Sequence, residues 1–78
     1  MGITDRYSNF NNEHPDAHPY IVRIAQWATS SYFVGSGTEH RMRWNVHINA
    51  MNKEEAIQNA RKDIPYNGVS VEGVWIVV

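Results

Sequence analysis

The stretch RMRWNVHINA, residues 41–50, decides the fold, because hydrophobic and polar side chains alternate along it without a break. The hydrophobic positions are Met42, Trp44, Val46, Ile48 and Ala50, and the polar ones are Arg41, Arg43, Asn45, His47 and Asn49. A period of two is typical of a β-strand with one buried face and one face in water. The sequence therefore predicts a strand that forms one wall of a small core.

The segment after this strand is predicted to be a helix over about residues 52–64. Asn52 stands at the N-cap position, and Glu55 three residues later completes a capping-box pattern. Pro65, followed by an Asn-Gly pair, ends the helix in a turn. A narrow apolar stripe, suited to covering one face of a sheet, is formed by Ala56, Ile57, Ala60 and Ile64.

Residues 69–78 are predicted to form the last strand. Its inward-facing phase switches near Gly73, which indicates a bulge there. Because the stretch closes on the apolar residues VWIVV, we expect it to be a central strand. The alternative is an edge at residues 74–78 through which the protein, expected to be a monomer or a weak dimer, would dimerise.

Residues 20–27, YIVRIAQW, are predicted to form the first strand, because they are rich in β-branched and aromatic side chains and follow a proline. A helix is the alternative, since four small or aliphatic side chains of this region share one helical face. Residues 32–34 are expected to be extended, in the same bent strand or in a second one, and residues 35–37, GSG, to form a loop.

Residues 1–19 are polar and show no period, and we expect them to be a flexible arm. Residues 20–78 are then expected to form a single two-layer α+β domain of β-β-α-β order. Its sheet is predicted to be antiparallel, with three or four strands and one helix packed on one face.

The composition of the 78 residues excludes several function classes. There is no cysteine, and hence no disulfide framework, thiolate nucleophile or cysteine zinc site. The formal charge of −1 lacks the basic excess of a dedicated nucleic-acid binder. No apolar run is as long as a membrane span, and the polar start is unlike a signal peptide. We therefore expect a cytoplasmic protein without a membrane partner.

No sequence motif for catalysis, a cofactor or a resident metal is present. His14, Asp16 and His18 are zinc-ligand types, but they lie in the predicted arm, where we expect them to be unliganded. The GSGT stretch at residues 35–38 leads into a strand, whereas phosphate loops lead into a helix. We expect a protein that is not an enzyme; a dyad of His40 or His47 with a carboxylate is the catalytic alternative.

The polar face of the strand at residues 41–50 is the candidate binding site. Its side chains are Arg41, Arg43, Asn45 and His47, and Arg23 of the neighbouring strand can join them. Arginine forks pair with carboxylates and phosphates, so this face is predicted to meet an acidic protein surface. The alternative is that these side chains simply face solvent.

Nucleic acid is a less favoured partner for the same face, because the aromatic residue of this strand, Trp44, has the inward phase. Trp27, Trp44 and Trp75 are predicted to be core residues. Tyr7 and Phe10 are expected either to fold back from the arm or to anchor a partner.

Part of the chain resembles the small inhibitor of host RNA polymerase made by T-odd coliphages. The matching residues are Val46, His47, Ile48, Asn49, Ala50, Glu55, Ala56, Ile57, Ala60, Pro65, Gly68, Val69, Val71 and Val74. The resemblance implies a three-stranded sheet with one helix and a protein that blocks the engagement of polymerase with promoter DNA. Other phage inhibitors, including some anti-CRISPR proteins, share this pattern.

The chain departs from that family at the family's contact positions. Gly73 and Trp75 stand where the family has arginines in its last strand, and Asn45 stands where it has an acidic residue. No functional residue of the family therefore carries over. The resemblance implies a protein that occupies a surface on a host macromolecular machine.

Overall fold

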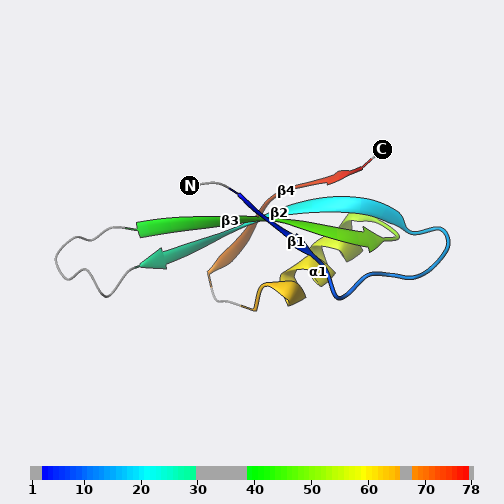
Figure 1. The fold of residues 1–78 in the computed structure, drawn as a ribbon, viewed down its shortest axis with the longest axis horizontal. Helices are drawn as coiled ribbons and strands as arrows, with labels where there is room; N and C mark the ends of the chain where they lie inside the picture. Colours follow the sequence, from blue (N-terminus) through cyan, green and yellow to red (C-terminus); the bar gives the residue numbers. More distant parts are fainter. Residues whose placement is uncertain (1–2, 30–38, 66–67, 78) are drawn as a thin grey trace.

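The computed structural model describes residues 3–29, 39–65 and 68–77. Its elements in chain order are β1 (Thr4–Tyr7), β2 (His18–Thr29), β3 (Glu39–Ala50), α1 (Lys53–Asp63) and β4 (Val69–Ile76) (Figure 1). The side chains of residues 27–29 and 39–41, and the predicted extended segment and loop at residues 32–37, lie outside the described residues. The strand predicted at residues 20–27, the alternating strand predicted at residues 41–50 and the predicted helix are all present. The helical alternative for residues 20–27 is therefore wrong.

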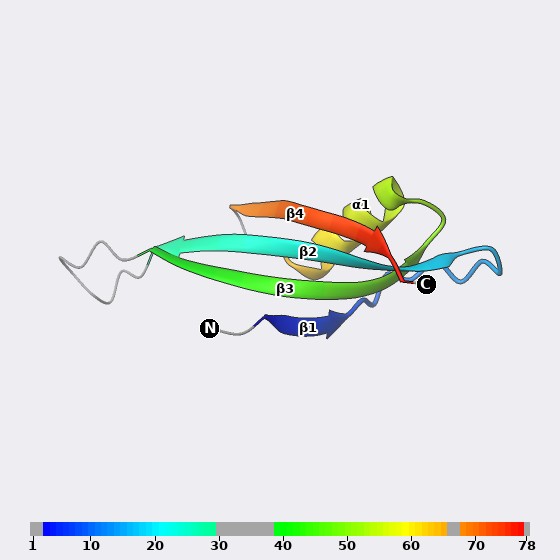
Figure 2. The same ribbon diagram turned by 90° about the horizontal axis from the view of Figure 1, so that it is seen from above.

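The four strands form one sheet in the order β1-β3-β2-β4, with α1 packed on one side (Figure 2). The α+β class with a single helix on one face is confirmed. β2 is antiparallel to both β3 and β4, as predicted, whereas β1 is parallel to β3. The sheet is thus mixed, and the prediction of a purely antiparallel sheet is wrong.

The strand β1 lies inside the segment that we predicted to be an arm. Its residues Thr4 to Tyr7 pair with Trp44 to His47 of β3. The chain then stays attached to the sheet through backbone hydrogen bonds. The backbone N–H of Ser8 donates to the backbone carbonyl of His47 at 2.9 Å, and that of Asn12 donates to the backbone carbonyl of Asn49 at 2.8 Å. The mobility expected for this segment remains a prediction, to be measured by amide exchange.

The core lies between the sheet and α1. Val22, Ile24 and Val46 are completely buried, and Ala56 and Ala60 on the helix are equally inaccessible. The predicted alternation of β3 is confirmed from Trp44 to Ala50, where every inward position is buried, but Met42 at the start of the predicted run is 45% exposed. Burial of these aliphatic side chains is the main force that holds the helix on the sheet.

The predicted helix cap is present. The Asn52 side chain accepts a hydrogen bond from the Glu55 amide at 2.8 Å, and the Glu55 carboxylate accepts one from the Met51 amide at 3.3 Å. Two acidic residues in the first turn and two basic residues in the last turn complement the helix dipole. Beyond the helix, Gly68 has a φ of 75°, a conformation that glycine adopts without a steric penalty.

The strand β4 is an edge strand, paired only with β2, so the prediction that it is central is wrong. The predicted bulge is confirmed: Arg23 pairs with Gly73 and Ile24 with Val71, which leaves Glu72 as the extra residue. The bulge turns Trp75 to the side away from the helix, where it is 40% exposed, and its predicted core role is therefore wrong. Among the described residues, no helix combines the length and hydrophobicity needed to span a membrane.

Candidate functional site

The helix covers only one face of the sheet, and the opposite face, called here the open face, is the candidate site (Figure 1). The register places two rows of residues across all four strands of this face. One row consists of Asp5, Asn45, Arg23 and Gly73, and the next of Tyr7, His47, Ile21 and Trp75. Arg43 lies on the same face of β3. Four of the predicted site residues are therefore brought together.

Arg23 and Trp75 form the first contact of the open face. The Arg23 guanidinium carbon lies 5.5 Å from the centre of the Trp75 ring, within the range of a cation–π interaction. Its Nε donates a hydrogen bond to Asn45 Oδ1 at 3.2 Å. Gly73 makes room for the indole, because a Cβ built there would lie only 3.3 Å from Trp75 Cζ3. The arginine is thereby held in place by an aromatic ring and an amide.

Tyr7 and His47 form the second contact. Their rings stack with centroids 4.9 Å apart and planes inclined by 21°. His47 Nε2 also lies 3.3 Å from Asp5 Oδ1. Tyr7 is 78% exposed, so its outer surface is available to another molecule. The imidazole is positioned by two side chains of β1, the strand that the sequence analysis missed.

Arg43 does not point at solvent as an unpaired cation. Its Nε donates to Glu72 Oε1 at 3.1 Å, and the bulge in β4 is what brings this glutamate to it. Arg23 differs, since neither of its contacts in the described part of the chain is with a carboxylate. Arg41 belongs to β3, but its side chain lies outside the described residues. The predicted acid-binding role therefore falls mainly on Arg23.

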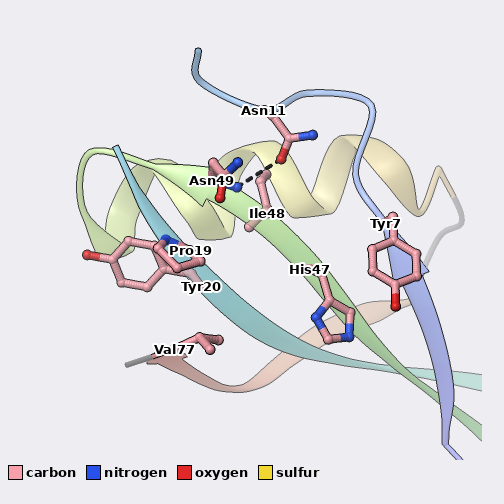
Figure 3. Close-up of a pocket in the computed structure, with 8 residues that line it drawn as sticks. All are labelled: Tyr7, Asn11, Pro19, Tyr20, His47, Ile48, Asn49 and Val77. Atoms are coloured by element: carbon pink, nitrogen blue, oxygen red, sulfur yellow. Dashed lines mark hydrogen bonds between the residues drawn. The ribbon is translucent and has the colours of Figure 1, made fainter. Parts of the chain in front are cut away.

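A shallow depression of about 260 Å³ lies beside the Tyr7–His47 stack (Figure 3). Asn11 and Asn49 both line it, and the backbone amide of Asn49 donates a hydrogen bond to Asn11 Oδ1 at 2.8 Å. The full set of lining residues is Tyr7, Asn11, Pro19, Tyr20, His47, Ile48, Asn49 and Val77. This volume is below the usual range for an enclosed small-molecule site, so the depression suits a single side chain or planar group.

The candidate metal ligands and the candidate catalytic dyad from the sequence analysis lie apart from one another. His14 Nδ1 accepts a hydrogen bond from the Asp16 amide at 3.0 Å and lies 3.7 Å from Asp16 Oδ2. Within residues 3–29, 39–65 and 68–77, no three potential ligands converge as a metal site would require. His47 does meet a carboxylate, as the catalytic alternative requires, but that carboxylate is 58% exposed, and the neighbouring Ser8 hydroxyl is directed at Asp63 instead.

Sequence reasoning named Tyr7 only as an aromatic residue that folds back from the arm or anchors a partner, and it placed Trp75 in the core. For Trp75 a signal existed: alternation counted from the bulge near Gly73 puts Trp75 and its neighbour Val74 on opposite faces of the sheet. For Tyr7 no local signal existed, because its position depends on pairing with β3. The argument against nucleic acid that rested on the inward phase of Trp44 is therefore wrong, since two other aromatic rings occupy the open face. Comparisons with protein-family models, curated proteins and solved structures found no match to this chain.

Proposed function

We propose that this chain is a small binding protein that docks its open face on a larger macromolecular machine and blocks the surface it covers. The observation that carries the proposal is the cation–π contact of Arg23 with Trp75 on the sheet face opposite α1. Trp, Tyr and Arg contribute most of the binding energy at protein interfaces, and the open face presents Trp75, Tyr7 and Arg23 together.

The shape of the site favours occlusion over catalysis. The described part of the open face is a twisted sheet surface with the shallow depression beside Tyr7 and His47, and the core between sheet and helix is filled by apolar side chains, two of them aromatic. Catalytic groups usually need a water-excluded pocket that shifts their pKa values, whereas a flat surface suits contact with another macromolecule. Steric blocking needs only affinity and correct placement.

The partner we propose first is a host protein complex with an acidic surface, and the resemblance over residues 46–74 names bacterial RNA polymerase as the complex to test. Arg23 engages Asn45 through Nε, which leaves its terminal nitrogens for a carboxylate of the partner. The Trp75 ring holds the Arg23 guanidinium in place for this contact. A CRISPR effector is the alternative machine, and a host-cell cytoplasm is the compartment in which either would be met.

Single-stranded nucleic acid is the second candidate, because Tyr7 and Trp75 offer stacking surfaces on the same sheet face. Sheet-face RNA binders use such aromatic platforms. The formal charge of −1 favours the protein partner, since single-strand binders combine stacking with a positive groove.

The test is binding of the purified chain to purified bacterial RNA polymerase, to a CRISPR effector and to labelled single-stranded RNA. We expect Trp75→Ala and Arg23→Ala each to weaken protein binding by about 2 kcal/mol or more. Arg61→Ala, which removes an exposed arginine from the helix side, is the matched control and should leave binding unchanged.

Two outcomes would contradict the proposal. Binding that survives both open-face substitutions would place the contact elsewhere on the molecule. Binding to RNA alone, with log affinity falling steeply as log salt rises, would select the nucleic-acid candidate instead.

A further inference from the structure

The two edges of the sheet are built differently. β1 has four residues, two of which are the charged Asp5 and Arg6. β4 has eight residues with the single charge of Glu72, and Trp75, Ile76 and Val77 at its end are 40–42% exposed. Short, charged edges resist pairing with other strands, whereas long, apolar edges favour it. The β1 edge is protected in this way, and the second half of the β4 edge is not.

The backbone of β4 offers a defined set of hydrogen-bonding groups at this edge. The Val77 amide donates to the Pro19 carbonyl at 2.8 Å, so Val77 faces β2. In an antiparallel pair, residues that face the partner strand alternate with residues that face away. With Trp75 opposite Ile21, the amides and carbonyls of Val74 and Ile76 therefore point away from β2, toward the outside of the sheet.

We propose that a second copy of this chain pairs with the edge, with the two β4 strands antiparallel about a two-fold axis at Trp75. In this register Val74 of each copy lies opposite Ile76 of the other, and these two pairs exchange the outward-pointing backbone hydrogen bonds. The interface is isologous, since the same residues are used on both sides. It rests on the β4 edge and does not require the proposed partner-binding function.

The side chains near the axis match themselves. Ile76 and Val74 share the helix side of the sheet, so each would meet the other across the interface. The two Trp75 rings would lie side by side on the open face. Glu72 does not place like charges at the axis, because its carboxylate is held by Arg43 of its own chain. A charged partner strand would find no counter-charge in residues 73–77, whereas an identical strand needs none.

The pairing joins two sheets into one of eight strands, four from each copy, and places the two open faces side by side. Because only one strand edge is buried, the interface is smaller than that of a standard stable complex, and we expect dissociation in the micromolar range or weaker. Dilution therefore gives monomers in which the partner-binding face can be measured separately.

The experiment is sedimentation equilibrium of the full chain from micromolar to millimolar concentration, together with amide exchange at the two extremes. We expect a monomer–dimer equilibrium, and slower exchange of the Val74 and Ile76 amides at high concentration. The Trp75 amide, which faces β2, should be protected at both concentrations. Ile76→Lys should abolish the dimer, and Ile76→Pro should do the same, because proline removes an amide that β2 does not use. Thr4→Lys, the same charge on the β1 edge, should leave the dimer intact.

A chain that stays monomeric at millimolar concentration would overturn the inference. So would a dimer that survives Ile76→Lys, or one that Thr4→Lys dissolves. Val74 and Ile76 amides that are protected even at high dilution would mean that something other than a second copy covers the edge. Partner binding measured below the dimer range is independent of all these outcomes, so failure of the dimer and failure of the proposed function are distinguishable.

Discussion

The Ser8 hydroxyl donates a hydrogen bond to the carboxylate of Asp63, which ties the residue after β1 to the last residue of α1. The other oxygen of the same carboxylate accepts a hydrogen bond from the backbone N–H of Asn9 at 3.1 Å. Both Ser8 and Asp63 are buried, with 6% and 7% of their surfaces exposed. The carboxylate thus fixes the segment that follows β1 against the helix layer.

Asp63→Ala is expected to lower the free energy of unfolding by about 1 to 3 kcal/mol, because it leaves a buried hydroxyl and an amide without their acceptor. Denaturant unfolding measures this loss, and amide exchange should show faster exchange in β1 than in β3. Asp63→Asn keeps one acceptor oxygen and should cost less. Equal stability of the wild type and Asp63→Ala would mean that the contact contributes nothing.

Asn52→Ala is expected to destabilise the protein by about 0.5 to 2 kcal/mol, since the Glu55 amide loses its cap. Asn52→Asp should retain most of the stability, because aspartate also accepts this hydrogen bond and its charge suits the helix N-terminus. Thermal unfolding of the two variants side by side gives the measurement. An equal loss of stability in both variants would show that the Asn52 side chain does not stabilise the protein by accepting this hydrogen bond.

Gly73→Ala is expected to displace the Trp75 ring, because the added methyl would lie 3.3 Å from the indole. The ring is exposed and has room to move, so stability should change by less than about 1 kcal/mol. The Trp75 indole NH and Arg23 Nε resonances should shift, while those of the buried Trp44 stay in place. Unshifted Trp75 resonances would show that the ring does not lie over Gly73 in solution.

Arg23→Ala is expected to weaken partner binding more than Arg43→Ala does. Arg43 must give up Glu72 before it can meet an acidic partner, whereas the carboxylate-free contacts of Arg23 leave its charge available. An ion pair as exposed as that of Arg43 with Glu72 contributes about 0 to 1 kcal/mol, and an exposed cation–π contact such as that of Arg23 about 0.5 to 1 kcal/mol, so neither substitution should alter folding much. Titration calorimetry of both variants decides the order, and a larger effect of Arg43→Ala would reverse the assignment.

The local features of this fold could be predicted from the sequence because they depend on neighbouring residues. The alternation around Val46 and the cap at Asn52 involve groups within a few positions of each other. The bulge at Glu72 could be placed because the inward phase of the valines changes there. These features gave the class of the fold and most of its core.

The features that were missed depend on pairing between distant segments. β1 has the sequence TDRY, which has neither alternation nor a buried residue, and it is a strand only because β3 supplies its hydrogen bonds. The edge position of β4 follows from the order of strands, which no local pattern contains. The two aromatic contacts of the open face required this order, so the candidate site was predicted only for its central strands.

The order of the strands also has a consequence for how the chain reaches its folded state. β2 and β3 are consecutive and form the middle of the sheet, whereas β1 and β4 come from opposite ends of the chain and join it from outside. Closing long loops costs entropy that only later contacts repay, so the central hairpin should form first and the two outer strands should add to it. During synthesis β1 emerges from the ribosome before β3, so it has no partner until β3 has followed it.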